Sequence, residues 1–321
     1  MARLAYSSWN MADKKVGCNA WGVPAPAQSQ TMHSVEILGC DFSSSPNVRK
    51  NIVLAWGRIA RGRVVLQRLE RLSSLADFAA VLSQSKSWVG AFDLPFGLPR
   101  ELVESLGWPL EWVACIRHFA SLERAQIRGL FAAFCNARPV GGKFAHRACD
   151  PLAGSSPSMK WVNPPVAYML HAGVPLLLNA GVDFPGLHAG DPQRVALEAY
   201  PGLLAREVLD GWISGGQGTG RRSYKSDDKT KHTLQRQTAR SDLVHALETG
   251  HGAFGPLRLR MRLKLTPLQR TALVADASGD ALDAVLCMLQ AAWAAQQHAA
   301  GQPHYGLPSH VDPLEGWIIT L

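Results

Sequence analysis

The chain has 321 residues, of which 47% are hydrophobic and 18% are charged, and it carries a net charge of +8. This balance is typical of a folded globular protein, and no apolar run reaches the roughly 18 residues of a membrane-spanning helix. The first residues do not resemble a secretory signal and the six cysteines contain no CxxC pair, so we expect a cytoplasmic protein without a membrane partner or a structural zinc site.

The sequence divides into two tails and one domain. Residues 1–31 are polar and lack hydrophobic periodicity, which predicts a disordered tail. The domain covers 32–301, with a loop-rich insert at about 135–184 and a basic segment at about 214–264. We expect 302–321 to form a C-terminal tail.

The first half of the domain predicts a strand-rich unit. Apolar and β-branched runs, separated by turn residues, indicate four strands and one helix in the order β-β-β-α-β. Two of the strands, the first and the fourth, end on an aspartate, Asp41 and Asp93. The predicted strands cover 35–41, 51–57, 63–69 and 88–93, and the helix covers 75–82.

Three further elements follow the insert. Residues 194–200 predict a fifth strand with Glu198 near its end, and 229–248 predict a basic helix. Residues 280–300 give the strongest helical pattern in the chain, because apolar residues recur there at helical spacing.

Asp41 stands where the first strand leaves the sheet and enters the turn SSSP. An unpaired carboxylate at the end of an apolar strand is costly to bury. It is therefore either hydrogen-bonded by the turn that follows or bound to a cation. Ligands of open α/β sheets collect outside the carboxyl ends of the strands, and this stretch alone leaves both interpretations open.

Asp280 and Asp283 open the last helix at a spacing that places them on one face. One interpretation is structural: Asp280 is the N-cap, and Asp283 is favoured at position N3 by the helix dipole. The other is functional, because Asp283 lies beside the apolar stripe and precedes Ala284, a small residue that lets a helix approach a sheet.

If the first and fourth strands are neighbours, Asp41 and Asp93 lie side by side, and the last helix can bring Asp283 to them. Converging carboxylates do not all stay ionised unless cations lie among them. Oxygen ligands suit Mg²⁺ or Mn²⁺, and two such ions about 3.5–4 Å apart form a clamp for in-line displacement at phosphorus.

Five short motifs occur in order along the chain: GCDFSSSP (39–46), AFDLPFGLP (91–99), HRACDP (146–151), EAYP (198–201) and GDALDA (279–284). Together they resemble the RNase H-like superfamily, and within it a family of predicted RNase H-like nucleases. The last motif also resembles the acidic final helix of Holliday-junction resolvases. The resemblance implies an α/β fold with a five-stranded mixed sheet of order 3-2-1-4-5 flanked by helices, and two-metal hydrolysis of nucleic acid.

The resemblance also implies the roles of individual acids. Asp41, Asp93 and Asp283 would ligate Mg²⁺ or Mn²⁺. Asp280 would be a further ligand or would support one, and Glu198 would be a further catalytic acid.

Positive charge is concentrated in residues 221–240, which hold seven Lys or Arg against two Asp. Such a concentration suits a polyanionic partner, although a solvated surface segment is the alternative. On the first interpretation, DNA or RNA phosphates would be bound by basic residues of this segment and of the insert: Lys143, Arg147, Lys160, Arg221 and Arg222.

The leading functional hypothesis is therefore a metal-dependent nuclease. Two others stay open: a catalytically silent module that binds nucleic acid, and a metal-dependent phosphotransferase or phosphatase acting on a small molecule. A narrow pocket under the 135–184 insert would favour the small molecule, whereas an open basic groove would favour nucleic acid.

Overall fold

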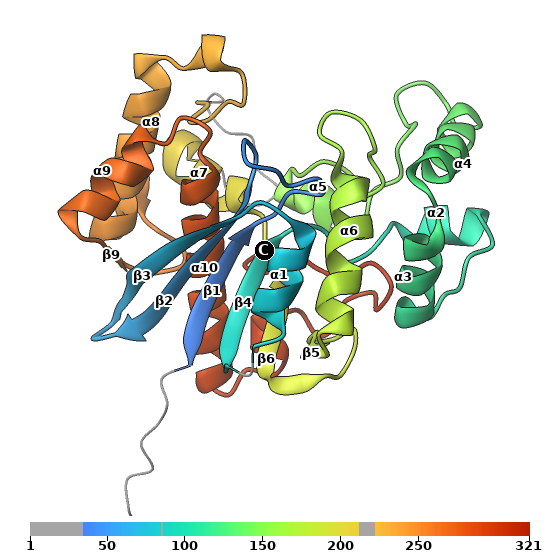
Figure 1. The fold of residues 1–321 in the computed structure, drawn as a ribbon, viewed down its shortest axis with the longest axis horizontal. Helices are drawn as coiled ribbons and strands as arrows, with labels where there is room; N and C mark the ends of the chain where they lie inside the picture. The colour runs from blue at the N-terminus through green and yellow to red at the C-terminus, as the bar shows by residue number, and fades with distance from the viewer. Residues whose placement is uncertain (1–34, 85, 212–221) are drawn as a thin grey trace, which may run out of the picture. The chain divides into compact units, whose positions relative to one another are not determined.

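A seven-stranded mixed sheet lies at the centre of the structure, in the order β5-β6-β4-β1-β2-β3-β9 (Figure 1). The computed structural model describes residues 35–84, 86–211 and 222–321, so the predicted tail 1–31 lies outside them. β1, β2 and β3 are antiparallel, and the other neighbouring strands are parallel. The strands of this sheet are β1 (Glu36–Asp41), β2 (Ile52–Ala60), β3 (Arg63–Leu72), β4 (Trp88–Asp93), β5 (Val182–Asp183), β6 (Asp191–Glu198) and β9 (Leu263–Lys264).

Helices cover both faces of the sheet. α10 crosses β1, β4 and β2 on one face, where residues of α7, α8 and α9 join the same core. α1, α2, α3, α4 and α6 contribute to the core on the other face. The helices are α1 (Leu75–Leu82), α2 (Arg100–Ser105), α3 (Trp112–Ser121), α4 (Arg124–Asn136), α5 (Cys149–Ala153), α6 (Val166–Asn179), α7 (Pro201–Asp210), α8 (Leu234–Thr249), α9 (Pro267–Ala275) and α10 (Asp280–Ala299). Short 3-10 turns, η1 (Lys229–Lys231) and η2 (Pro303–Gly306), and a hairpin of β7 (His251–Gly252) and β8 (Gly255–Pro256) complete the fold.

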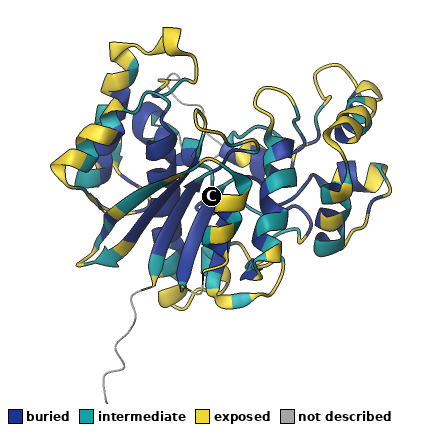
Figure 2. Ribbon diagram, viewed as in Figure 1, coloured by how far each residue is buried: buried dark blue, intermediate teal, exposed yellow. Residues whose placement is uncertain are grey.

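The central strands are apolar along most of their length because both of their faces are covered (Figure 2). Successive side chains of a strand point to opposite faces. In β1, Ile37 therefore packs in the core under α10, whereas Leu38 and Cys40 pack in the opposite core.

The backbones of α10 and β1 lie in direct contact, which is possible because residue 39 is a glycine. A Cβ atom on Gly39 would lie 2.0 Å from the backbone oxygen of Ala284. The expectation that Ala284 lets the last helix lie close to the sheet agrees with this contact. The contact carries the first turn of α10 to the carboxyl end of β1.

The predicted α/β class, with a mixed sheet flanked by helices, is confirmed, but the sheet has seven strands rather than five. Its middle five strands have the order β3-β2-β1-β4-β6, the predicted 3-2-1-4-5 in chain order. The two additional strands, β5 and β9, contain two residues each. A hydrophobic period cannot be recognised over so short a run.

Two regions are more ordered than the sequence predicted. The 135–184 insert contains α5 and the fourteen-residue helix α6, which lies in the core opposite α10. The expected C-terminal tail packs against the sheet, where Ile319 donates its N–H to the backbone oxygen of Glu198 at 2.9 Å. Residues 302–321 therefore belong to the same compact unit as the domain.

Candidate metal centre

Asp41 and Asp93 are brought together by strand register and side-chain alternation. They are direct partners at the carboxyl ends of the parallel strands β1 and β4. Asp41 shares a face with Ile37, and Asp93 shares a face with Val89 and Ala91, all of which pack under α10. Both carboxylates therefore point to the face that α10 covers.

α10 supplies the third carboxylate from its first turn. The helix begins after Gly279, whose φ of 79° lies in the left-handed region, and no side chain caps it at that residue. Asp276 instead accepts hydrogen bonds from Ala281 N–H at 3.0 Å and from the Ser278 hydroxyl at 2.7 Å. The interpretation that Asp280 is the N-cap with Asp283 at N3 is therefore wrong, and Asp283 is fully buried facing the strands.

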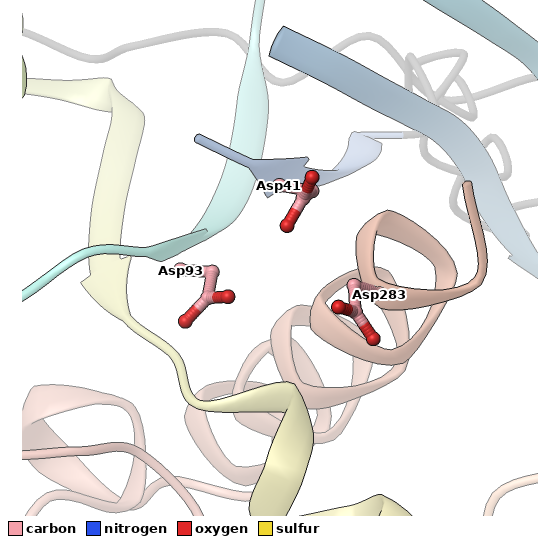
Figure 3. Close-up of side chains that lie close together, drawn as sticks. All are labelled: Asp41, Asp93 and Asp283. Atoms are coloured by element: carbon pink, nitrogen blue, oxygen red, sulfur yellow. The ribbon is translucent and has the colours of Figure 1, made fainter. Parts of the chain in front are cut away.

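The three carboxylates form a compact cluster, which we call the acidic triad (Figure 3). One oxygen atom from each of Asp41, Asp93 and Asp283 lies within 4.8 Å of the other two. Two oxygens bound to one Mg²⁺ at 2.0–2.1 Å lie at most about 4.2 Å apart, so small side-chain rotations suffice to close the triad on an ion. Since all of its ligands are carboxylate oxygens, the triad could hold a divalent ion such as Mg²⁺ or Mn²⁺.

Burial and mutual repulsion perturb the triad. Burial, followed by the charge of Asp283, raises the pKa of Asp41 well above its usual range. Burial likewise raises the pKa of Asp93 to about 7, with Asp283 adding to the shift and Lys225 opposing it. The charged forms of Asp41 and Asp93 are therefore disfavoured in the folded protein, and a bound cation would favour them.

Lys225 and Tyr224 reach the triad from the basic segment. The Lys225 ammonium forms an ion pair with one oxygen of Asp283, and the Tyr224 hydroxyl donates to the other. Although burial by itself lowers the pKa of Lys225, the charges of Asp283 and other neighbouring groups raise it well above its usual range. The ammonium group of Lys225 is thus already attracted to the place where a metal ion would bind.

A cavity of about 540 Å³ opens onto the triad. Five acids line it: Asp41, Asp93, Glu198, Asp227 and Asp280. Asp280 is buried beside the triad. Its cationic lining residues include Lys50 and Lys225. Carboxylates that attract metal and ammonium groups that attract phosphate therefore share one cavity.

Glu198 lies outside the triad. Phe92 of β4 pairs with Glu198 of β6, so Glu198 is one residue out of step with Asp93 and points to the opposite face. There it accepts hydrogen bonds from the Arg147 guanidinium at 2.6 and 2.7 Å and from Phe96 N–H at 2.9 Å.

Arg147 is 2% exposed and also pairs with Asp150 at 2.9 Å. Its guanidinium donates to the backbone oxygen of Glu315 as well, at 3.1 Å. We call Arg147, Asp150 and Glu198 the arginine cluster. Arg147 and Glu198 line the cavity, but the guanidinium already donates to these partners. The structure therefore gives Arg147 a packing role, and its predicted contact with phosphate stays a prediction.

Lys143, Lys160 and Arg222, three other predicted phosphate-binding residues, are not among the lining residues of the cavity. Lys143 is exposed on the insert, and Lys160 is half-buried. The exposed Arg222 pairs with Asp242 at 2.7 Å, and Arg221 lies outside the described residues. Their predicted contacts with phosphate stay predictions.

Sequence analysis missed Lys225, Tyr224 and Lys50 as residues of the site. The first two fall within the basic segment, but no periodicity distinguishes them from its other residues. Lys50 follows the serine-rich turn after β1, and its ammonium pairs with Asp227 at 2.7 Å. These three side chains reach the site only through the tertiary fold.

Comparisons of the chain with protein-family models, with curated proteins and with solved structures find no significant match. Over the part of the chain that the structure describes, every helix is too short or too polar to cross a bilayer. Functional assignment therefore depends on the geometry and chemistry of the site.

Proposed function

We propose that this protein is a metal-dependent nuclease that hydrolyses phosphodiester bonds of nucleic acid, with Mg²⁺ or Mn²⁺ held by Asp41, Asp93 and Asp283. The observation that carries the proposal is the convergence of these three carboxylates from β1, β4 and α10. The order of the middle five strands agrees with the resemblance to the RNase H-like superfamily, and this supports the proposal further.

The acids of the site would have separate roles in the reaction. Bound divalent ions in such a site polarise the phosphoryl oxygens, activate a water molecule and stabilise the leaving oxygen. Asp41 and Asp93 would hold the ions at the strand ends, and Asp283 would complete the ligand set from α10. Asp280, which also lines the cavity, is placed to orient a water molecule or a further ion.

Lys225 would change partners when substrate binds. Its ammonium now neutralises part of the charge of Asp283. A divalent ion at the triad would supply that charge instead, leaving Lys225 at the cavity wall to bind a phosphate oxygen. Lys50, on the same lining, would add a second phosphate contact.

A metal-dependent phosphatase or phosphotransferase acting on a small molecule is a second candidate. One observation favours it: the triad opens into a cavity of about 540 Å³ that is lined in part by the insert. This volume lies within the range of small-molecule sites, roughly 300–1,000 Å³. The size of the cavity also limits which part of a nucleic acid could enter it.

The experiment is a hydrolysis assay on mixed DNA and RNA substrates with Mg²⁺ and with Mn²⁺, for the wild type and for Asp41→Asn. The substitution keeps the side-chain shape but removes a charged ligand, so we expect activity to fall by at least the 10–100-fold seen on losing a residue that merely supports a ligand. Asp77→Asn, at an exposed position of α1, is the matched control and should retain activity.

Two results would contradict the proposal. Unchanged hydrolysis by Asp41→Asn would remove the triad from the reaction. Binding of Mn²⁺ without hydrolysis of any nucleic acid would instead indicate the silent module or the small-molecule enzyme, which a panel of phosphate monoesters would separate.

A further inference from the structure

The cavity at the triad is lined by two chemically different sets of residues. One set is polar or charged: it includes Lys50, Lys225, Ser43 and Ser226, and Asp227, which pairs with Lys50. Such groups suit the oxygens of a phosphate ester.

The other set is apolar, and four of its residues come from the insert, which also supplies Ser155, Ser156 and Asn163. Pro164, Pro165, Val166 and Met169, at the start of α6 and just before it, line the cavity together with Leu94. Apolar surface of this kind receives an organic group rather than a second charged phosphate. The lining therefore suits a ligand that joins a phosphate to one flat or apolar group, as a nucleotide does.

The triad lies at depth in this cavity. Asp283 is fully buried, and Asp41 and Asp93 are only partly exposed. Residues of the insert and of the basic segment both line the cavity, so a phosphate at the carboxylates would lie close to both. In a duplex, the phosphate arrives with its base paired and stacked, and taking that base out of the stack costs free energy, whereas an unpaired base has no such cost.

From these observations, and resting on the proposed function, we propose that the site takes one unpaired nucleotide unit at a time, at the end of a single strand, and not the interior of a duplex. The phosphate would lie between the triad and the two lysines. The terminal nucleoside would lie against the apolar lining residues of the insert.

The test measures kcat/KM of the full chain with Mn²⁺ on four DNA probes of matched sequence: a linear single strand, a circular single strand, a linear duplex and a closed circular duplex. Thymidine 5′-(p-nitrophenyl phosphate) is the small probe. We expect the linear single strand to be cleaved at least tenfold faster than the other DNA probes, with mononucleotide products, and the small probe to be hydrolysed as well.

A substitution among the apolar lining residues of the insert tests the placement of the nucleoside. Met169→Trp should raise KM at least tenfold for both the single strand and the small probe, while the Mn²⁺ affinity measured by calorimetry stays unchanged. Val140→Trp, at a position of the same insert that is 94% exposed, is the control and should change neither value.

The outcomes separate this inference from the proposed function. Cleavage of either circle or of the linear duplex at a rate within tenfold of the linear single strand would overturn the unpaired-end inference and leave the nuclease intact. Hydrolysis of the small probe alone would overturn it in favour of free nucleotides. If no probe is hydrolysed, the proposed function fails, and fluorescence anisotropy then decides the inference: duplex bound as tightly as single strand would refute it.

Discussion

The acidic triad and the arginine cluster both bury carboxylates at the carboxyl ends of neighbouring strands, but they compensate the charge differently. In the arginine cluster, the guanidinium bonds to Asp150 and Glu198, and Phe96 N–H adds a further donor. In the acidic triad, the Lys225 ammonium and the Tyr224 hydroxyl both bond to Asp283, beside which Asp41 and Asp93 lie.

This difference separates a structural use of buried charge from one that suits a ligand. Buried ions that are paired and hydrogen-bonded hold segments of the chain in place, and the arginine cluster joins the insert to β6 and to the C-terminal residues. The acidic triad instead gathers three carboxylates around a single ammonium group, an arrangement that suits a bound cation. The predictions below test this division, beginning with the largest effect.

Removing Arg147 should produce the largest loss of stability. Arg147→Ala leaves Asp150 and Glu198 buried without their cation, which costs about 3–5 kcal/mol of unfolding free energy. Denaturant unfolding measures this loss. Arg222→Ala breaks an exposed pair with Asp242, so as the control it should cost less than about 1 kcal/mol. Similar losses in the two variants would mean that the arginine cluster does not stabilise the fold.

Divalent ions should stabilise the protein through the triad alone. Mn²⁺ at one hundred times its dissociation constant would raise the unfolding free energy by about 2.7 kcal/mol. Thermal unfolding with and without Mn²⁺ should show this gain in the wild type and in Asp77→Asn, but not in Asp93→Asn. An equal gain in Asp93→Asn would place the bound ion elsewhere in the protein.

Gly39→Ala should damage the triad without touching a carboxylate. The added methyl would lie 2.0 Å from the backbone oxygen of Ala284, so α10 must move, at a cost of about 1–3 kcal/mol. We expect the Mn²⁺ affinity to fall together with the stability. Gly129→Ala, at a helical position where an added Cβ meets nothing within 4 Å, should leave the affinity unchanged and slightly stabilise α4; unchanged affinity in Gly39→Ala would show that this contact does not position Asp283.

Titration of Asp93 should make the stability of the metal-free protein depend on pH. Its pKa rises from 3.8 to about 7, chiefly through burial, so the folded metal-free protein holds a proton that the unfolded chain releases. Stability should therefore be greatest below about pH 4 as far as this group is concerned, and should fall as the pH rises to about 7. Urea unfolding across this range in chelator should show a shallower fall for Asp93→Asn, and an identical slope would contradict the assignment.

Strand patterns predicted two of the three acids of the triad well. The apolar runs before Asp41 and Asp93 gave the strands and placed both acids at strand ends. The direction in which each acid points depends on alternation along its strand, and Asp41 and Asp93 happen to be matched in register. Glu198 shows the limit, because its register on β4, and hence its face, is set by packing that no local pattern encodes.

To predict the role of Asp283 from the sequence, one must decide whether it supports the helix N-terminus or binds a ligand. Both interpretations fitted the spacing from Asp280, and Asp276, which lies before the helix, decided between them by bonding to its first turn. Lys225 could not be predicted for a different reason. It lies within residues 222–228, which form neither helix nor strand, so only the completed fold shows which of the many basic side chains reaches the acids.

The close contact between Gly39 and Ala284 joins the first strand of the sheet to the last long helix of the chain. During synthesis, a nascent chain that lacks this helix carries only two of the three acids. The triad is therefore complete only when nearly the whole polypeptide has left the ribosome, and a prematurely terminated product would contain most of the sheet but only two of the three carboxylates.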